Sequence, residues 1–285
     1  MLNDGQTKIS KFRGNLPVIL KYVILTVVAL FILVPIVIII FGALKTRGEF
    51  YTIPYVPPIP PRWGNIIKVV SLPIFWYMMR NSLIIMASTT FIVVTVSALS
   101  AFVFSRMKFR GRNIFFNFFT LGLMFPVTIA ILPIFLVVRQ IGLTNNLIGV
   151  ILVQTAFQLS ISIVILRNFF MEIPSELQDA ACIDGCNTVG FFRRILLPLA
   201  RPSLAAVAAL TMVTSWNDLL VPLVLIDREK LWTLPLGTMQ FQGQYGQDLS
   251  LVAAFLLVSA IPAIIFYIFA QRQLVSGLTA GAVKG

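Results

Sequence analysis

Six long apolar stretches follow one another along the chain, separated by shorter segments that hold most of the charged residues. Each stretch is at least as long as the roughly 20 residues that an α-helix needs to cross a bilayer. The pattern therefore predicts six transmembrane helices and an all-α integral membrane protein. The expected helices cover residues 17–44, 81–104, 114–138, 147–170, 203–226 and 249–270.

The segments between these stretches predict the rest of the organisation. A polar tail of residues 1–16 precedes the first helix, and a tail of residues 273–285 follows a five-helix core of residues 81–272. Residues 45–80 contain repeated prolines and aromatic residues, which favours an extra-cytoplasmic loop over a helix. The first helix is too long for the apolar core of a cleaved signal peptide, so we expect it to stay in the membrane.

Three of the expected helices carry residues that affect packing. The second is rich in Ser, Thr and Ala, which let helices approach closely, so we expect it inside the bundle. The third contains Pro126 and Pro133, which predict a kinked and mobile helix. The fourth places Gln154 and Gln158 one turn apart on the same face, and such a polar face must point away from lipid.

The fifth stretch contains an acidic residue, Asp218, directly after Trp216 and Asn217. A carboxylate within an apolar span is costly and marks a candidate functional site. Asp218 could instead lie near the outer interface, paired with local groups. The sequence leaves these two interpretations open.

The composition agrees with a membrane location. Of 285 residues, 58% are apolar and 11% are charged, and the mean hydropathy is +0.94, whereas about 25% of residues are charged in soluble proteins. The net charge of +12 comes from basic residues at the ends of the apolar stretches, which favours membrane orientation over nucleic-acid binding. With both termini in the cytoplasm, the inner segments hold most of the Lys and Arg residues, which satisfies the positive-inside rule.

The main polar structure is the loop of residues 171–202, between the fourth and fifth stretches. Ser175 and the glutamine three residues later match a capping box, so a helix should begin there. Gly185 is placed to end this helix in the left-handed conformation. Thr188 can cap a second short helix, which Pro198 would stop. We therefore expect two short helices joined by a glycine turn.

The first of these helices has one narrow face of small and apolar groups, formed by Leu177, Ala180, Ala181 and Asp184. This pattern alone is equally typical of an amphipathic segment that lies in the lipid interface. Glu176, Asp179 and Asp184 could also be the carboxylates of an intramembrane enzyme. No second catalytic group lies near them in the sequence, so docking of a partner is the favoured interpretation.

Several kinds of chemistry are missing from the sequence. It has no histidine, which removes the commonest proton shuttle, the usual catalytic triad and most zinc sites. It has no P-loop motif, so we expect no ATP site in this chain. Cys182 and Cys186 are one helical turn apart without further ligands, and we interpret both as packing residues. We therefore expect no catalytic residue, no metal site and no bound cofactor.

The loop resembles a known motif. The run Asp179-Ala180-Ala181-Cys182-Ile183-Asp184-Gly185, followed by Phe192, Ile195, Leu197 and Pro198, resembles the "EAA…G…I.LP" cytoplasmic loop of the membrane subunits of ATP-driven, binding-protein-dependent (ABC) importers. The chain is most similar to the carbohydrate-uptake branch, in the segments 124–126 and 141–146 and in the ending 277–285 as well. One departure is Asp179, which stands where the family has a longer glutamate.

The resemblance implies a type I ABC importer permease fold in the cytoplasmic membrane of a bacterium or archaeon. It implies docking of an ATPase on the loop, through Glu176, Asp179, Ala180, Ala181, Asp184, Gly185 and Phe192. It also implies that Trp216 and Asn217 line the pathway or pack helices, and we add Gln154, Gln158 and Asp218 as pathway candidates. The implied partners are an ABC ATPase homodimer or heterodimer that binds ATP, a second permease subunit, an extracytoplasmic solute-binding protein and membrane lipid.

The expected cargo is a sugar, an oligosaccharide or a related polyol. A non-sugar solute stays an alternative, because no local motif identifies the cargo. A second alternative is an ion-driven secondary transporter, for which Asp218 is the single midplane candidate and no inverted repeat is evident. Co-purification with a P-loop ATPase separates these classes.

Overall fold

The structure, a computed structural model, describes residues 4–243 and 246–280. It divides into two compact units, one formed by the chain up to Val69 with Phe241–Val258, the other by Val70–Gln240 with the segment from Ser259 onward. Four helices are long and apolar enough to cross a membrane, and six spans result if each of two bent helix pairs counts as one span. The expected all-helical architecture is therefore confirmed, with two of the six spans bent.

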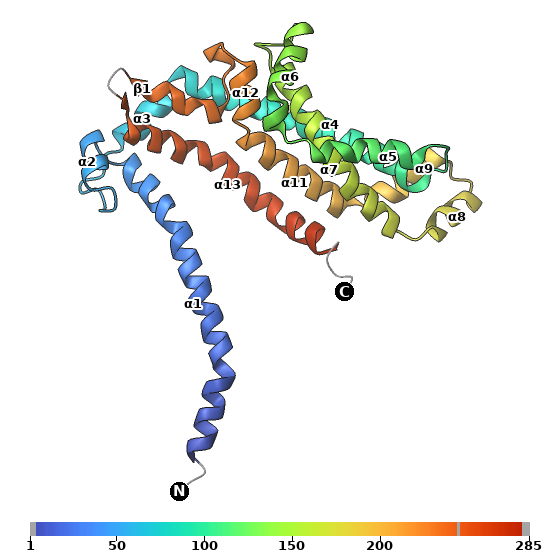
Figure 1. The fold of residues 1–285 in the computed structure, drawn as a ribbon, viewed down its shortest axis with the longest axis horizontal. Helices are drawn as coiled ribbons and strands as arrows, with labels where there is room; N and C mark the ends of the chain where they lie inside the picture. Colours follow the sequence, from blue (N-terminus) through green and yellow to red (C-terminus); the bar gives the residue numbers. More distant parts are fainter. Residues whose placement is uncertain (1–3, 244–245, 281–285) are drawn as a thin grey trace. The chain divides into compact units, whose positions relative to one another are not determined.

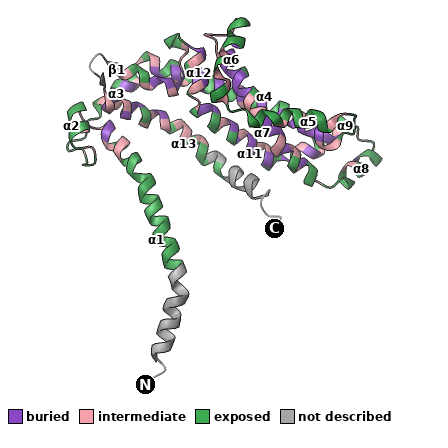
Figure 2. Ribbon diagram, viewed as in Figure 1, coloured by how far each residue is buried: buried purple, intermediate pink, exposed green. Residues whose placement is uncertain are grey.

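The first unit contains α1 (Asp4–Ala43), α2 (Arg47–Thr52) and a two-stranded antiparallel hairpin, β1 (Gln242–Gly243) and β2 (Gly246–Gln247). It also holds most of α3 (Gly64–Ser71) and the start of α13 (Leu249–Ala280). The apolar side chains of α1 between Val18 and Val37 are exposed on all sides (Figure 2). A helix that is apolar all round requires an apolar environment, here lipid or another membrane helix.

The segment after α1 is more ordered than an extended loop. Lys45 is 1% exposed, and its Nζ donates hydrogen bonds to the carbonyl oxygens of Ile53 and Pro54 at 2.6 and 3.0 Å. The side-chain amide of Asn65 donates to the carbonyl oxygens of Ala43 and Lys45 at 3.0 and 2.7 Å. The bond to Ala43 satisfies a carbonyl group that the end of α1 would leave free, and the bonds to Ile53 and Pro54 do the same after α2.

The boundary of the next helix differs from the expectation. Helix α4 (Pro73–Arg106) begins eight residues before the expected position 81. Proline is tolerated at the first turn of a helix because the missing N–H has no partner there. The prolines of residues 45–80 therefore did not exclude helix: α2, α3 and the first two turns of α4 all lie within this range.

The second unit is built on α4, α7 (Leu147–Glu172) and α11 (Arg201–Asn217), which pack side by side (Figure 1). Ser97, Ala98 and Ala101 of α4 are buried in this interface, as expected for a helix with small residues. A second group of buried residues joins α4, α7 and α12 (Leu220–Leu225). The short helix η3 (Glu229–Leu231) precedes η4 (Leu234–Phe241), which ends this part of the unit.

The third expected span is broken instead of kinked. Helix α5 (Arg112–Leu121) and the 3₁₀ turn η1 (Gly122–Met124) meet α6 (Val127–Gln140) at an angle of 106°. The break is at Phe125, which is extended because the residue before a proline is biased away from helix. Pro133, by contrast, lies inside α6.

The fifth expected span is also discontinuous. Several short elements precede it in the chain. They are α8 (Glu176–Ile183), α9 (Thr188–Phe191), a π-helical turn η2 (Phe192–Leu196) and α10 (Leu197–Leu199). The axis then bends by 74° into α11, which ends at Asn217. The expected helix at residues 203–226 was therefore wrong beyond Asn217, because Asp218 is extended and α12 starts separately at Leu220.

Candidate functional site

The polar loop after α7 has the expected plan with different caps. Ser175 has helical backbone angles and makes no side-chain capping bond, so the expected capping box is wrong. The second helix is capped by Asn187, whose Oδ1 accepts a hydrogen bond from the Gly190 N–H at 2.7 Å, and not by Thr188. Gly185 has a φ of +76°, which confirms the expected left-handed turn.

The residues expected to dock an ATPase fall into two groups. Glu176, Asp179, Ala180, Asp184 and Gly185 are exposed, whereas Ala181 and Phe192 are only 5% and 8% exposed. Large apolar side chains accompany the exposed group, namely Leu177 at 42%, Ile183 at 87% and Val189 at 63% exposure. The exposed face thus combines carboxylates with apolar groups, which is the usual chemistry of a protein interface.

The two buried residues connect the loop to the helix bundle. Ala181, Phe191 and Phe192 belong to a cluster that includes Phe102 of α4 and Phe170 of α7. The rings of Phe192 and Phe102 are 4.8 Å apart. Phe192 therefore packs inside the chain, and its contact with an ATPase stays a prediction.

Arg106 strengthens the same connection, and the sequence reasoning did not single it out. Its guanidinium donates hydrogen bonds to the carbonyl oxygens of Phe170 and Ile173, where the chain leaves α7. Arginine suits this position because its planar group can bind two of the carbonyls that a helix end leaves free. The sequence shows a basic residue at the end of an apolar stretch. It does not show the partners of this residue, because they lie more than 60 residues away.

A second polar site surrounds Gln154 in the middle of α7. Its Oε1 accepts hydrogen bonds from Ser215 Oγ at 2.6 Å and Thr89 Oγ1 at 3.4 Å. Its Nε2 donates to Asp218 Oδ2 at 2.8 Å. One buried amide therefore links α4, α7 and α11 to the residue that follows α11.

Asp218 also organises the start of α12. Its Oδ1 accepts hydrogen bonds from the N–H groups of Leu220 and Val221 at 3.1 and 3.3 Å. A carboxylate that accepts backbone N–H groups at a helix start is a stabilising cap. Asp218 is therefore paired locally and also lines a cavity, and its functional role stays a prediction.

This cavity has a volume of about 540 Å³. Four of the five pathway candidates line it, namely Gln154, Gln158, Asn217 and Asp218, together with hydroxyl groups of Thr128, Thr214 and Ser215. Trp216 does not belong to it: its ring is 6% exposed, packs edge-on against Phe266 and lines a separate apolar pocket of about 290 Å³. Trp216 is therefore a packing residue in this structure.

Comparison with known proteins assigns the family. Residues 93–278 match the family described as "Binding-protein-dependent transport system inner membrane component". The chain belongs to this family. It is an inner-membrane, multi-pass permease of an ABC importer, and the ATPase of such a system is a separate subunit.

Two relatives illustrate the similarity of this permease to carbohydrate transport proteins. The trehalose transport system permease protein SugB of Mycobacterium tuberculosis is 38% identical over 72% of this chain and 76% of its own length. The arabinooligosaccharides transport system permease protein AraQ of Halalkalibacterium halodurans is 36% identical over 74% of this chain and 75% of its own length.

A solved structure has the same fold. One chain of a bacterial ABC transporter involved in the import of the acidic polysaccharide alginate superposes with a TM-score of 0.81, at 22% sequence identity. The match covers 91% of this permease and 97% of that chain. The type I permease fold expected for this sequence is thus confirmed.

Proposed function

We propose that this permease imports a disaccharide or oligosaccharide, driven by an ATPase that docks on α8 and the Gly185 turn. The observation that carries the proposal is the exposed face of α8, whose buried residue Ala181 packs in one cluster with residues of α4 and α7. Phe192 and Arg106 hold the two ends of the loop against the same helices. A force on α8 would therefore reach the helices that carry Gln154, and rocking of such helices changes access to a pathway.

The cavity around Gln154 and Asp218 supports a polyhydroxy cargo. Its lining offers amides, hydroxyls and a carboxylate, which can exchange hydrogen bonds with sugar hydroxyl groups. The two relatives named for trehalose and arabino-oligosaccharides have cargo of this kind. A polyol fits the same lining, whereas a purely apolar solute would leave these groups unsatisfied.

The remaining parts of the system follow from this role. We infer a pair of ATPase subunits in the cytoplasm, a second permease subunit beside this one and a solute-binding protein outside. Both termini and α8 would lie in the cytoplasm, which agrees with the distribution of Lys and Arg. This chain would hold no cofactor of its own, and ATP would be bound by the ATPase subunits.

Uptake by proteoliposomes tests the proposal. The complex, purified through a tag on this permease, is reconstituted with ATP inside the vesicles and the binding protein outside. We expect uptake of radiolabelled trehalose or an arabino-oligosaccharide that requires ATP and is unaffected by proton and sodium ionophores. Uptake that follows an ion gradient without ATP would instead identify a secondary transporter with Asp218 as its ionisable group.

The cargo and the energy source are separated by a second readout. A complex that hydrolyses ATP on addition of binding protein but takes up none of a panel of di- and oligosaccharides retains the ATPase coupling and refutes the carbohydrate assignment.

A further inference from the structure

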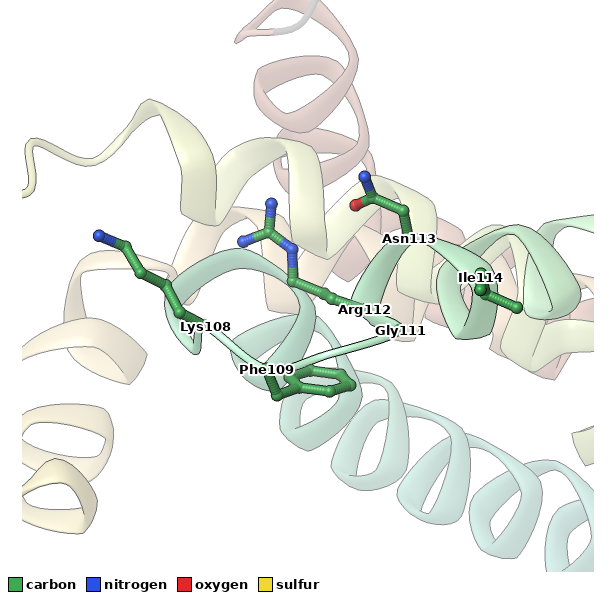
Figure 3. A pocket seen from close by; sticks show the side chains of 6 residues that line it. All are labelled: Lys108, Phe109, Gly111, Arg112, Asn113 and Ile114. Atoms are coloured by element: carbon green, nitrogen blue, oxygen red, sulfur yellow. The ribbon is translucent and has the colours of Figure 1, made fainter.

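A cavity of about 530 Å³ lies at the turn that joins α4 to α5, away from the site described above (Figure 3). Its lining consists of Lys108, Phe109, Gly111, Arg112, Asn113 and Ile114. Figure 3 shows the polar side chains of Lys108, Arg112 and Asn113 projecting to the same side of the turn. The cavity thus presents two cationic groups and one amide together.

No ion pair balances the positive charge at this turn within the part of the chain that the structure describes. Lys108, Arg110 and Arg112 form no ion pair with any carboxylate in residues 4–243 and 246–280. Arg112 also interacts with the like charge of Arg167 on α7. The guanidinium of Arg167 lies 4.0 Å from the ring centre of Phe116. Several cations held together without a counter-charge favour an anion from outside the chain.

Apolar groups border the same cations. Phe109 and Ile114 line the cavity and are 40% and 75% exposed, and Met107 and Phe115 beside them are 42% and 55% exposed. A free phosphate ion would gain nothing from these side chains. An amphiphile with an anionic headgroup and acyl chains would contact both kinds of surface.

The location of the turn agrees with such a ligand. It joins the end of one membrane span, α4, to the start of the next, whose first residues Ile114, Phe115 and Phe118 are exposed and apolar. A residue between two spans lies at the depth of the lipid headgroups, where basic side chains attract anionic lipids.

We propose that the α4–α5 turn is a binding site for an anionic phospholipid, with Lys108 and Arg112 on the phosphate group and Phe109 and Ile114 on the acyl chains. Arg110, which is exposed beside them, adds to the attraction. The proposal rests on the membrane location of the permease and is independent of the nature of its cargo.

The test compares two double variants in the purified transporter complex. Lys108→Gln with Arg112→Gln removes both cations of the site. Arg193→Gln with Arg194→Gln is the matched control, because it removes two exposed cations beside a cavity of similar volume, about 530 Å³, on the loop after α8. Native mass spectrometry then counts bound phosphatidylglycerol, phosphatidylcholine and glycerol 3-phosphate in separate titrations.

We expect the unmodified complex and the Arg193/Arg194 control to retain phosphatidylglycerol. The Lys108/Arg112 double variant should bind it at least about tenfold more weakly, as two basic side chains contribute at a charged membrane surface. Exchange of the two cations, Lys108→Arg with Arg112→Lys, should preserve binding. Phosphatidylcholine and glycerol 3-phosphate should bind weakly to all forms.

Four results would overturn the proposal. The first two are unchanged phosphatidylglycerol binding in the Lys108/Arg112 variant and an equal loss of binding in the Arg193/Arg194 control. The third is binding of glycerol 3-phosphate to the unmodified complex as tight as that of the lipid. The fourth is loss of the ATPase subunit from the Lys108/Arg112 variant while the lipid is retained. The last would identify the turn as a protein contact.

A measurement on the unmodified complex makes the test independent of the variants. A photoactivatable phosphatidylglycerol should label peptides that contain residues 107–116. Labelling confined to other peptides would refute the site even if the variants did not fold.

Discussion

At the scale of single residues, Gln154 is the side chain with the most consequence for the bundle. Its amide is 6% exposed and contacts Thr89, Ser215 and Asp218, which come from different segments. An amide is suited to this place because its oxygen can accept two hydrogen bonds while its nitrogen donates. The helices are thereby held in register by hydrogen bonds, in a lipid environment where apolar burial adds little.

Replacement of Gln154 by Ala should lower the stability of the permease. The change leaves the carboxylate of Asp218 and the hydroxyl of Ser215 without their amide partner, and a buried unsatisfied group costs about 1–3 kcal/mol. Thermal unfolding in detergent should show a clearly lower midpoint. Gln158→Ala is the control, because Gln158 is half-buried at the same cavity, and an equal loss of stability in both variants would contradict the role of Gln154.

Glu49 predicts a pH dependence at the start of α2. The backbone N–H and then the hydroxyl of Thr46 donate to its carboxylate, and they lower the pKa of Glu49 below its usual range. A lowered pKa in the folded state means that the ionised form stabilises the cap above the unfolded pKa. This contribution is lost as the pH falls through the lowered pKa.

Hydrogen exchange measures this effect. After correction for the intrinsic rates, the amides of residues 46–52 should exchange faster at about pH 3 than at pH 7 in the unmodified chain. The variant Glu49→Gln should show little change between these conditions, and a similar pH response in both forms would exclude Glu49 as the titrating group.

At the scale of elements, the loop of α8 and α9 is constrained at two places, namely the turn between its helices and its attachment to the helix bundle. Gly185 makes the turn between the helices with a positive φ. The attachment consists of the contact between Phe192 and Phe102 and of the hydrogen bonds from Arg106 to the end of α7. We expect the turn to present α8 to a partner, and the attachment to pass the motion of α8 to α4.

Gly185→Val should uncouple ATP hydrolysis from uptake while the chain still inserts. Valine at a positive φ costs about 1–2 kcal/mol, and its branched side chain would enter the exposed face beside Asp184. Gly142→Val is a close control, because Gly142 has a φ of +73° and, like Gly185, has nothing within 4 Å of an added Cβ. Equal loss of uptake in both variants would attribute the effect to strain alone.

Arg106→Met should weaken the attachment of the loop to the end of α7. Without the guanidinium, the carbonyl groups of Phe170 and Ile173 lose their donors, so residues 170–176 should show faster hydrogen exchange and uptake per ATP hydrolysed should fall. Arg110→Met removes a cation of the same turn that has no hydrogen bond to this segment, and it should leave the exchange unchanged. Unaltered exchange in Arg106→Met would show that the packing of Phe192 is sufficient.

At the scale of the whole molecule, one bent span connects the loop of α8 and α9 to the polar cavity around Gln154. The loop of α8 and α9 continues through η2 and α10 into α11, and α11 carries Ser215 and Asn217 to the polar cavity. The axis bends by 74° before α11, so we expect a displacement of the loop to tilt α11. A tilt of this kind would change access to the cavity on ATP binding.

Thiol labelling can follow this change of access. With Cys182 and Cys186 replaced by Ser, Asn217→Cys places a single thiol on the cavity wall. Its reaction with a membrane-impermeant maleimide from one side should differ by severalfold between the nucleotide-free and the vanadate-trapped complex. Asn145→Cys, at the turn between α6 and α7, should react equally in both states, and equal labelling of position 217 would argue against tilting of α11.

The sequence was sufficient for features that depend on local composition. The apolar stretches predict membrane helices because burying backbone groups in lipid requires a helix, and all six expected stretches are helical for most of their length. The left-handed turn at Gly185 was also predictable, because glycine adopts it without steric cost. The polar face of Gln154 was correctly expected to point inward.

Only the tertiary structure decided which polar groups meet. Thr89, Gln154, Ser215 and Asp218 become one network because three helices pack together, and no local pattern specifies that contact. The burial of Phe192 and the partners of Arg106 have the same cause. Local sequence specifies where a helix can exist in lipid and, through Pro126, where the chain breaks at Phe125. The direction of the side chains depends on the neighbours that satisfy their hydrogen bonds.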